Sequence, residues 1–410
     1  MISSERASND TTISPDAAKP RPPTVLQLLP SLETGGVERG TVEIAEALAD
    51  AGWTPLVASS GGRMVHEVER AGATHLLFPA DNKNPVVMWK NIARLEQVIA
   101  THDVDILHVR SRAPAWSALV AARRAGIPLV TTFHGNYAAS APFKRLYNSV
   151  MTRGDRVIAI SDFIGEQVIE AYGADPDRVR VIPRGVDLRL FDPAAVTPAR
   201  LIALAESWRV SDGELVVLLP GRLTRWKGQY VMIEALARLE RGGMRCLLVG
   251  DDQGRDRYRR SLQGDIDRLG FAETAHIFGH CGDMPAAYML ADVVVSTSVE
   301  AEAFGRIVAE AQAMGRPVIA TDHGAARETV IEGETGWLVP PGDAGALADA
   351  IKVALALDGE ARERLASRAI AHVRANFTRD LMCRRTLDVY LELIDAPAFA
   401  PSPPRVLGPP

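Results

Sequence analysis

Short apolar runs alternate with amphipathic helical stretches twice along the sequence, and this pattern limits the fold more than any other feature. The first series runs from TVLQLL at 24–29 to RVRVIP at 178–183, and the second from ELVVLLP at 214–220 to PVIATD at 317–322. Apolar runs of this length separated by helices predict parallel βαβ units. Two series predict two doubly wound, Rossmann-like α/β domains that face each other across a cleft.

Between these series the pattern breaks, because residues 188–212 combine prolines with mixed polarity and contain no apolar run. The residues before the first series are polar, and the last ones, APAFAPSPPRVLGPP, hold too many prolines for regular structure. The predicted order is a disordered tail over 1–22, a first domain over 23–187, a linker over 188–212, a second domain over 213–378, a crossover helix over 379–395 that returns to the first domain, and a disordered tail over 396–410.

Composition removes several classes of protein. The formal net charge of −5 gives no general reason to bind nucleic acid. Three scattered cysteines without a CxxC pair argue against a disulfide framework and a zinc site. With no signal-peptide pattern at the start and no apolar run of about 18 residues, we expect a cytoplasmic protein. Motifs of serine hydrolases, zinc proteases and P-loop enzymes are also absent from the sequence.

The most informative segment is EAFGRIVAE at 302–310, which follows the apolar run DVVVSTS. A helix that begins after a strand points its free amides at the ligand side of a parallel sheet. Gly305 allows a ligand to approach the backbone closely. The carboxylates of Glu302 and Glu310 are strong acceptors for the hydroxyl groups of a sugar and a ribose. The alternative for such a pair of glutamates is a solvated face of an amphipathic helix.

A second segment, GRLTRWKG at 221–228, follows the first apolar run of the second series. Arg222 and Lys227 stand five residues apart around a predicted turn. Two fixed cations there would stabilise the negative charge of a departing nucleoside diphosphate and would replace a metal ion. No Asp-x-Asp motif of the metal-binding kind occupies a suitable position. The alternative is a solvated basic turn.

Together these segments resemble the donor-site motifs of family 4 glycosyltransferases, which have the GT-B fold. The resemblance extends from about residue 24 to 394 and is strongest over 219–340. It implies a retaining hexosyltransferase that uses a nucleotide-diphosphate sugar, with UDP and GDP both open, and no metal or other cofactor. The donor contacts it implies are Glu302 to the sugar, the Phe304 and Gly305 amides near the sugar and phosphates, Glu310 to the ribose, and Arg222 and Lys227 to the diphosphate.

Weaker signals gain meaning from the same resemblance. It implies that backbone groups of Ile277 and Phe278 contact the nucleotide base, and that the loop with Gly35 and Gly36 reaches the donor phosphate and the acceptor. His134, after the run TTF, would contact the donor sugar or the reacting centre, although a lone histidine can also be structural. The chain departs from the family at Ala303 and at His323-Gly324, where glycines are common, so the identity of the sugar stays open.

The first domain should bind the acceptor. Residues 106–154 contain seven lysines or arginines and no acidic residue, in a chain of net negative charge. The stretch APFKRLYNSVMTR combines aromatic, apolar and basic residues, which suits an anionic bilayer, although a solvated helix is the alternative. We therefore expect a glycan or lipid-linked acceptor, as in the synthesis of lipopolysaccharide or other cell-envelope polysaccharides, and peripheral binding to the inner face of the membrane.

Two other functions fit the same fold. A sugar-nucleotide epimerase would form product without an acceptor, whereas a phosphorylase would need a pyridoxal lysine, for which no clear position exists. A non-catalytic nucleotide-sugar-binding protein is the alternative from another class. The presence of both cations and both glutamates argues against that last reading.

Overall fold

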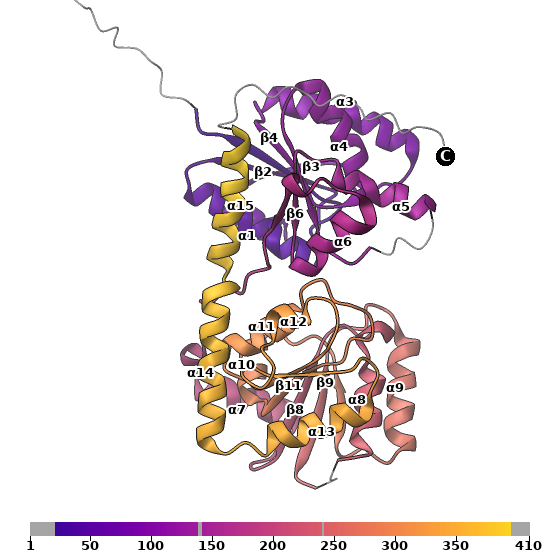
Figure 1. Cartoon of the computed structure of the whole chain (residues 1–410), viewed down its shortest axis with the longest axis vertical. Coiled ribbons are helices and arrows are strands. Elements are labelled where there is room, and N and C mark those ends of the chain that lie inside the picture. The colour runs from indigo at the N-terminus through magenta and orange to yellow at the C-terminus, as the bar shows by residue number, and fades with distance from the viewer. Residues whose placement is uncertain (1–20, 138–141, 240–241, 395–410) are drawn as a thin grey trace, which may run out of the picture.

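The computed structural model describes residues 21–137, 142–239 and 242–394 (Figure 1). The predicted tail at 396–410 lies outside the described residues. The predicted tail at 1–22 also lies outside them, except for Arg21 and Pro22. Figure 1 shows two α/β halves, one above the other, each with a sheet covered by helices. The last two helices run along one side of both halves.

Within the described residues, the first part of the chain forms a parallel sheet of seven strands in the order β3-β2-β1-β4-β5-β6-β7. The strands are β1 Thr24–Leu28, β2 Thr54–Ser59, β3 Thr74–Leu77, β4 Ile106–Val109, β5 Leu129–Phe133, β6 Arg156–Ala159 and β7 Val179–Val181. Strands β1, β4 and β5 are buried along their whole length, because helices cover both faces of the sheet.

The second part forms a parallel sheet of six strands in the described residues, in the order β10-β9-β8-β11-β12-β13. The strands are β8 Leu215–Pro220, β9 Met244–Val249, β10 Ala275–Phe278, β11 Val293–Ser296, β12 Val318–Thr321 and β13 Trp337–Val339. Both sheets and their flanking helices have the α/β architecture predicted from the alternating pattern.

The helices lie between the strands, as expected for βαβ units. In the first part they are α1 Gly36–Asp50, α2 Val65–Arg70, α3 Pro85–Thr101, α4 Arg112–Ala125, α5 Pro142–Asn148 and α6 Asp162–Tyr172. In the remainder they are α7 Pro198–Trp208, α8 Gln229–Leu236, α9 Asp256–Arg268, α10 Met284–Leu290, α11 Arg306–Ala313, α12 Ala326–Thr329, α13 Ala344–Leu355, α14 Gly359–Asn376 and α15 Arg379–Ile394.

The segment 188–212, for which the sequence suggested a linker, contains helix α7. The Thr197 side chain accepts a hydrogen bond from the Arg200 amide, and Pro198 occupies the first turn, so the helix has a strong start signal. Arg200 forms a bidentate ion pair with Asp283, the N-cap of α10, at 2.6 and 2.8 Å. Through this contact α7 packs against the second sheet's helices.

Helix α15 returns to the first sheet. Its residues Met382, Tyr390 and Leu393 share a core cluster with Val25 of β1 and Ile106 of β4. The preceding helix, α14, packs against α11 of the second part. The two last helices therefore bind both halves of the molecule, as the yellow ribbon in Figure 1 shows.

In each sheet the strand order reverses beside the first strand of the series, between β1 and β4 and between β8 and β11. Loops that leave two such strands diverge and open a crevice at their carboxyl ends, which is where doubly wound proteins bind ligands. Gly35 and Gly36 follow β1, Arg222 and Lys227 follow β8, and Glu302 follows β11. The topology therefore brings the predicted motifs to the two switch points.

Candidate active site

Lys227 and Glu302 form a buried ion pair at the switch point of the second sheet. The Lys227 Nζ lies 2.7 Å from Glu302 Oε1, and the two side chains are only 11% and 17% exposed. Lys227 ends the short 3₁₀ turn Arg225–Lys227 that follows β8, and Glu302 lies in the loop after β11. Residues 75 positions apart are thus in contact, which the linear spacing did not predict.

Two hydroxyl groups complete the surroundings of the Glu302 carboxylate. Ser298 donates a short hydrogen bond to Oε1, and Ser296 donates to the same atom at 3.4 Å. Burial works to raise the pKa of Glu302, but the Lys227 charge and the hydrogen bonds from Lys227 and both serines outweigh it, so the pKa lies below its ordinary value. Glu302 is therefore an anion at neutral pH.

Glu310 lies on the inner face of α11, one turn beyond the start of the helix. Tyr288 of α10 donates a hydrogen bond to its Oε2 at 2.9 Å, and Arg306 Nε lies 3.5 Å from its Oε1. Burial raises the pKa of Glu310, an effect that the Arg306 charge and the Tyr288 hydroxyl only partly reverse. The carboxylate predicted to hold the ribose therefore contacts two protein partners, Tyr288 and Arg306.

Arg306 connects the two halves of the molecule beside this carboxylate. Its Nη2 lies 2.9 Å from Glu43 Oε1 on α1 and donates to the Gly185 carbonyl at 3.2 Å. Glu43 is 5% exposed, and its second oxygen has no hydrogen-bond partner among the described residues. The ion pair therefore lies between the two sheets, close to where both switch points meet.

Two helix N-termini without side-chain caps complete the arrangement. Helix α1 has Gly35 as its N-cap and Gly36 as its first residue, and α11 has Gly305 as its N-cap. Gly305 has φ +77° and ψ +55°, a left-handed conformation that glycine adopts without strain. Free amides at such ends attract phosphate and other anions. The Phe304 side chain is buried against Phe377, so only its backbone is available to a ligand.

Arg222 is exposed at the end of β8, unlike Lys227. Its carbonyl accepts a hydrogen bond from Gln229 Nε2 at 2.9 Å, which fixes the turn that carries both cations. The strand-end loops of β8 and β9 touch here: a Cβ on Gly250 would lie 1.9 Å from the Gly221 carbonyl oxygen. The predicted cation pair therefore consists of one buried and one exposed group.

His134 lies after β5 in the first sheet. Its Nδ1 is 2.8 Å from Nη2 of Arg184, and its Nε2 is buried without a hydrogen-bond partner among the described residues. Burial and the positive charges of Arg184 and Arg110 hold the pKa of His134 well below its ordinary value. The ring is therefore neutral at pH 7.

The predicted base-binding strand end is already engaged by protein groups. The Ile277 carbonyl accepts from Arg259 at 3.3 Å and the Phe278 carbonyl from the Gly250 amide at 3.1 Å. The Phe278 ring stacks on Trp208 of α7, with ring centroids 5.3 Å apart. These two residues lie at β10, the edge of the second sheet, two strands away from β8.

Four residues of the site were not predicted from the sequence: Glu43, Arg184, Tyr288 and Arg306. Arg306 stands inside the EAFGRIVAE string, four residues before Glu310, and this helical spacing is the one signal that could have identified it. The other three come from distant parts of the chain, and only the fold brings them to the site.

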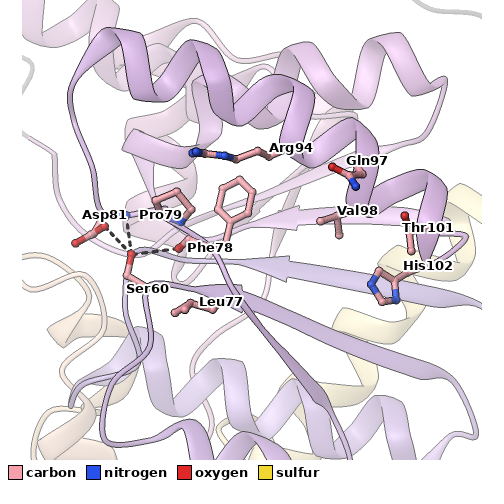
Figure 2. A pocket seen from close by; sticks show the side chains of 10 residues that line it. All are labelled: Ser60, Leu77, Phe78, Pro79, Asp81, Arg94, Gln97, Val98, Thr101 and His102. Carbon is pink, nitrogen blue, oxygen red and sulfur yellow. Dashed lines mark hydrogen bonds between the residues drawn. The ribbon is translucent and has the colours of Figure 1, made fainter.

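A separate open cavity of about 680 Å³ lies along the edge strand β3, beneath α3 (Figure 2). At one end of it, the Ser60 hydroxyl donates to Asp81 at 2.5 Å and lies 3.2 Å from the Phe78 carbonyl oxygen. None of the predicted site residues lines this cavity. The candidate active site is therefore the arrangement at the switch points and not this groove.

In the part of the chain that the structure describes, no group of three or more His, Cys, Asp or Glu side chains is arranged to hold a metal ion. The helices of the described ranges include none that is long and apolar enough to cross a bilayer.

Two family models match the chain. The model of Glycosyltransferase Family 4 covers residues 34–190, and that of Glycosyl transferases group 1 covers residues 203–372. The D-inositol 3-phosphate glycosyltransferase of Xylanimonas cellulosilytica is 32% identical over 310 residues, which are 70% of this chain and 72% of that protein.

Solved structures agree with the sequence matches. A glycosyltransferase from Rickettsia africae has a TM-score of 0.86 and 38% identity, covering 91% of this chain and 99% of that one. HepE of Anabaena, in complex with UDP-glucose, has a TM-score of 0.79 and 26% identity, covering 90% of this chain and 100% of that one. The predicted fold is confirmed by these likenesses.

Proposed function

The chain belongs to the family 4 glycosyltransferases of GT-B fold, and we propose that it transfers a sugar from a uridine diphosphate donor to an acceptor hydroxyl with retention of anomeric configuration. The observation that carries the proposal is the buried Lys227–Glu302 pair at the switch point of the second sheet. A cation and an anion fixed side by side suit the two ends of the bond that breaks, the diphosphate and the sugar.

The proposed uridine diphosphate donor is supported by the similarity to HepE, whose structure contains UDP-glucose. On binding, the diphosphate would accept hydrogen bonds from Lys227 and from the uncapped backbone amides of α1 and α11. Glu302 would accept hydrogen bonds from sugar hydroxyls. Each buried group would thereby exchange a protein partner for a substrate partner. Such an exchange avoids the cost of leaving a buried charge unpaired.

The proposed chemistry is electrostatic and needs no metal ion, because Arg222 and Lys227 supply the positive charge. The bond between the anomeric carbon and the phosphate oxygen breaks as the acceptor oxygen bonds the same face of that carbon. The acceptor proton passes to the departing phosphate. Glu302 is held by Lys227 and two serines, so it is assigned to sugar binding and not to nucleophilic attack.

The proposed acceptor is an anionic or lipid-linked glycan held by the first domain. The relative from Xylanimonas cellulosilytica is named for a phosphorylated acceptor, D-inositol 3-phosphate. Exposed aromatic residues lie near exposed cations on this domain: Trp89 of α3 is 72% and Phe143 of α5 is 78% exposed. Lys90, Lys144 and Arg145 flank them in sequence, which suits peripheral binding to an anionic membrane.

The test is a thermal-shift panel of UDP- and GDP-sugars with EDTA present, run on the wild type, Lys227→Ala and Glu310→Ala. A ligand that binds only the folded state raises the melting temperature. We expect UDP-sugars and UDP to stabilise the wild type and neither variant, and turnover of Lys227→Ala to fall about 100-fold or more. Donor conversion without acceptor would favour an epimerase. Stabilisation by UDP-sugars without any transfer would favour a binding protein.

Membrane binding has its own test. Wild-type protein should co-sediment with vesicles that contain anionic lipid and not with neutral vesicles. The double variant Trp89→Ser, Phe143→Ser should remain in the supernatant with its donor binding unchanged. Equal sedimentation of both proteins would remove this part of the proposal.

A further inference from the structure

Arg184 is a buried arginine whose guanidinium faces a histidine and no carboxylate at hydrogen-bond distance among the described residues. It follows β7, is 7% exposed, and places Nη2 2.8 Å from Nδ1 of His134. Strand β6 lies between β5 and β7, so the loops that follow β5 and β7 leave the same edge of the sheet two strands apart. The Arg184 side chain reaches His134 across this separation.

A guanidinium has only donors, so the hydrogen bond has a fixed direction. Burial, Arg306 and Arg110 lower the pKa of Arg184 to about 9, which still leaves it protonated at neutral pH. His134 Nδ1 must therefore accept, and it carries no proton. In a neutral ring the proton is then on Nε2.

The charges around His134 favour this neutral form. Burial is the largest cause, and the charged or titratable groups that act on the ring are Arg184 after β7, Arg110 after β4, and His108 on β4. Tyr137 lies on the same loop as His134 and is half-buried near Arg184. All of the named cationic groups work against protonation of the ring.

Carboxylates near this cluster act on Arg184 and not on the histidine. Glu38 and Glu43, both on α1, work to raise the pKa of Arg184, while Arg306 on α11 works to lower it. A histidine that takes a proton in catalysis has an anionic partner at Nδ1 to stabilise the cation. Here the partner at Nδ1 of His134 is the Arg184 guanidinium, which is a cation.

The other ring nitrogen is unused. Nε2 of His134 is buried and has no hydrogen-bond partner among the described residues. A buried donor without an acceptor is unfavourable, so such a group is expected to meet an oxygen when the site is filled. With Nδ1 held by Arg184, the ring can offer only its Nε2–H to a ligand.

We propose that Arg184 is a positioning residue that fixes His134 as a neutral donor, through Nε2–H, to a hydroxyl oxygen of the donor sugar. This inference rests on the proposed transferase function, in which a sugar occupies the cleft. His134 then takes no proton from the acceptor, which agrees with transfer of that proton to the leaving phosphate. Arg184 acts on the substrate only through His134.

The test reads the protonation of the ring directly. In protein labelled with nitrogen-15 at histidine, long-range proton–nitrogen correlation spectra distinguish protonated from unprotonated ring nitrogens, and a His134→Asn variant assigns the signals among the nine histidines. We expect unprotonated Nδ1 and protonated Nε2 from pH 5.5 to 8. The opposite tautomer, or a titration near pH 6.5, in the wild type would overturn the proposal.

Two variants separate positioning from a structural role. Arg184→Met should remove the fixed donor at Nδ1, so that both neutral tautomers of His134 become populated, and should lower kcat/KM for UDP-glucose by about tenfold, the effect of about 1.4 kcal/mol. Arg184→Lys retains a cationic donor and should restore the tautomer and part of the rate. An unchanged tautomer in Arg184→Met would overturn the proposal, and if that variant does not fold, the wild-type spectrum and Arg184→Lys still decide.

The proposed function can fail separately. UDP-glucose and the other donors could fail to stabilise or react with the wild type while His134 shows the expected tautomer. The transferase function would then be wrong, whereas Arg184 would still fix His134 as a donor. If donors react and the tautomer is reversed, only the role of Arg184 is wrong.

Discussion

Lys227 and Glu302 contribute both to the stability of the fold and to the proposed chemistry. Without substrate, each side chain keeps the other from being a buried, unpaired charge. Removing one partner of a buried pair is costly, commonly about 3–5 kcal/mol, whereas replacing both by neutral groups can be almost neutral. Stability and activity should therefore respond differently to the same substitutions.

Lys227→Met should lower both stability and turnover. The lost cation leaves Glu302 buried with hydroxyl partners only, so we expect a loss of about 3 kcal/mol in the free energy of unfolding. Turnover should fall about 100-fold or more, since the charge on the leaving diphosphate loses a fixed donor. Urea denaturation and initial rates measure the two effects.

The double variant Lys227→Met, Glu302→Gln is the matched control. It should recover most of the lost stability and none of the lost activity, because the buried pair becomes neutral while the site still lacks its cation. A double variant no more stable than Lys227→Met alone would contradict the pairing argument.

The same pair predicts a pH dependence of stability. The pKa of Glu302 is lowered in the folded protein from the ordinary value of 4.5. A carboxylate of this kind contributes stability above its unfolded pKa and loses it as pH falls through the folded pKa. The melting-temperature difference between the wild type and Glu302→Gln should therefore shrink as pH is lowered from 7 to 3.5. A constant difference would mean that Glu302 does not titrate with folding.

At the scale of an element, the loop after β11 carries Glu302 and is held by the loop after β12. The Ala325 amide donates to the Glu302 carbonyl at 3.0 Å. Gly324 has φ +58°, and a Cβ there would lie 2.4 Å from the same carbonyl oxygen. The glycine at 324, which follows His323, is thus required by both conformation and space.

Gly324→Ala should cost about 1–3 kcal/mol in stability and raise the KM for the donor, because the loop with Glu302 must shift. The control is Gly333→Ala, since Gly333 has φ +73° with nothing within 4 Å of an added Cβ. The Gly333→Ala variant has the backbone strain but no steric clash, so it should leave the KM for the donor unchanged. Melting temperatures and donor KM values of both variants separate the two effects.

The elements themselves were largely predictable, because each strand is a short apolar run and several helices begin with a clear cap. Asn84 before Pro85 and Asp343 before Ala344 are examples. The segment 188–212 was assigned to a linker because it lacks an apolar run, yet α7 forms there from a capped start and one ion pair to Asp283. The start signal of α7, Thr197 before Pro198, is local, whereas its ion pair to Asp283 on another element does not show in a local pattern.

The site was predictable only where one segment carries several of its groups. Glu302, Gly305 and Glu310 stand in one string, and the switch-point rule placed that string at the cleft. Arg184 and Glu43 stand alone in unrelated segments, and their contacts with His134 and Arg306 depend on how the two sheets meet. A single sequence carries no signal for such pairs.

At the scale of the whole molecule, contacts of charged side chains join the halves in addition to the last two helices. Arg306 reaches Glu43 between the sheets, and Glu328 of α12 accepts hydrogen bonds from the Asp162 and Phe163 amides at the N-terminus of α6, both at 2.8 Å. Glu328 thus occupies the positive end of a helix in the other half. Both contacts need the halves to be close together.

Glu328→Ala should shift the molecule toward a more open arrangement, because the first amides of α6 lose a charged acceptor from the opposite half. Hydrogen bonds to a charged group contribute about 1.5–3 kcal/mol each, so even half of one such bond changes the ratio of closed to open forms several-fold. Small-angle scattering should report a larger radius of gyration, and the KM for the donor should rise. Glu360→Ala is the control, since Glu360 is an exposed residue of α14 that pairs only with Arg364 of the same helix among the described residues. If scattering and KM are the same for both variants, the Glu328 contact does not hold the halves together, and Arg306–Glu43 with the last two helices must suffice.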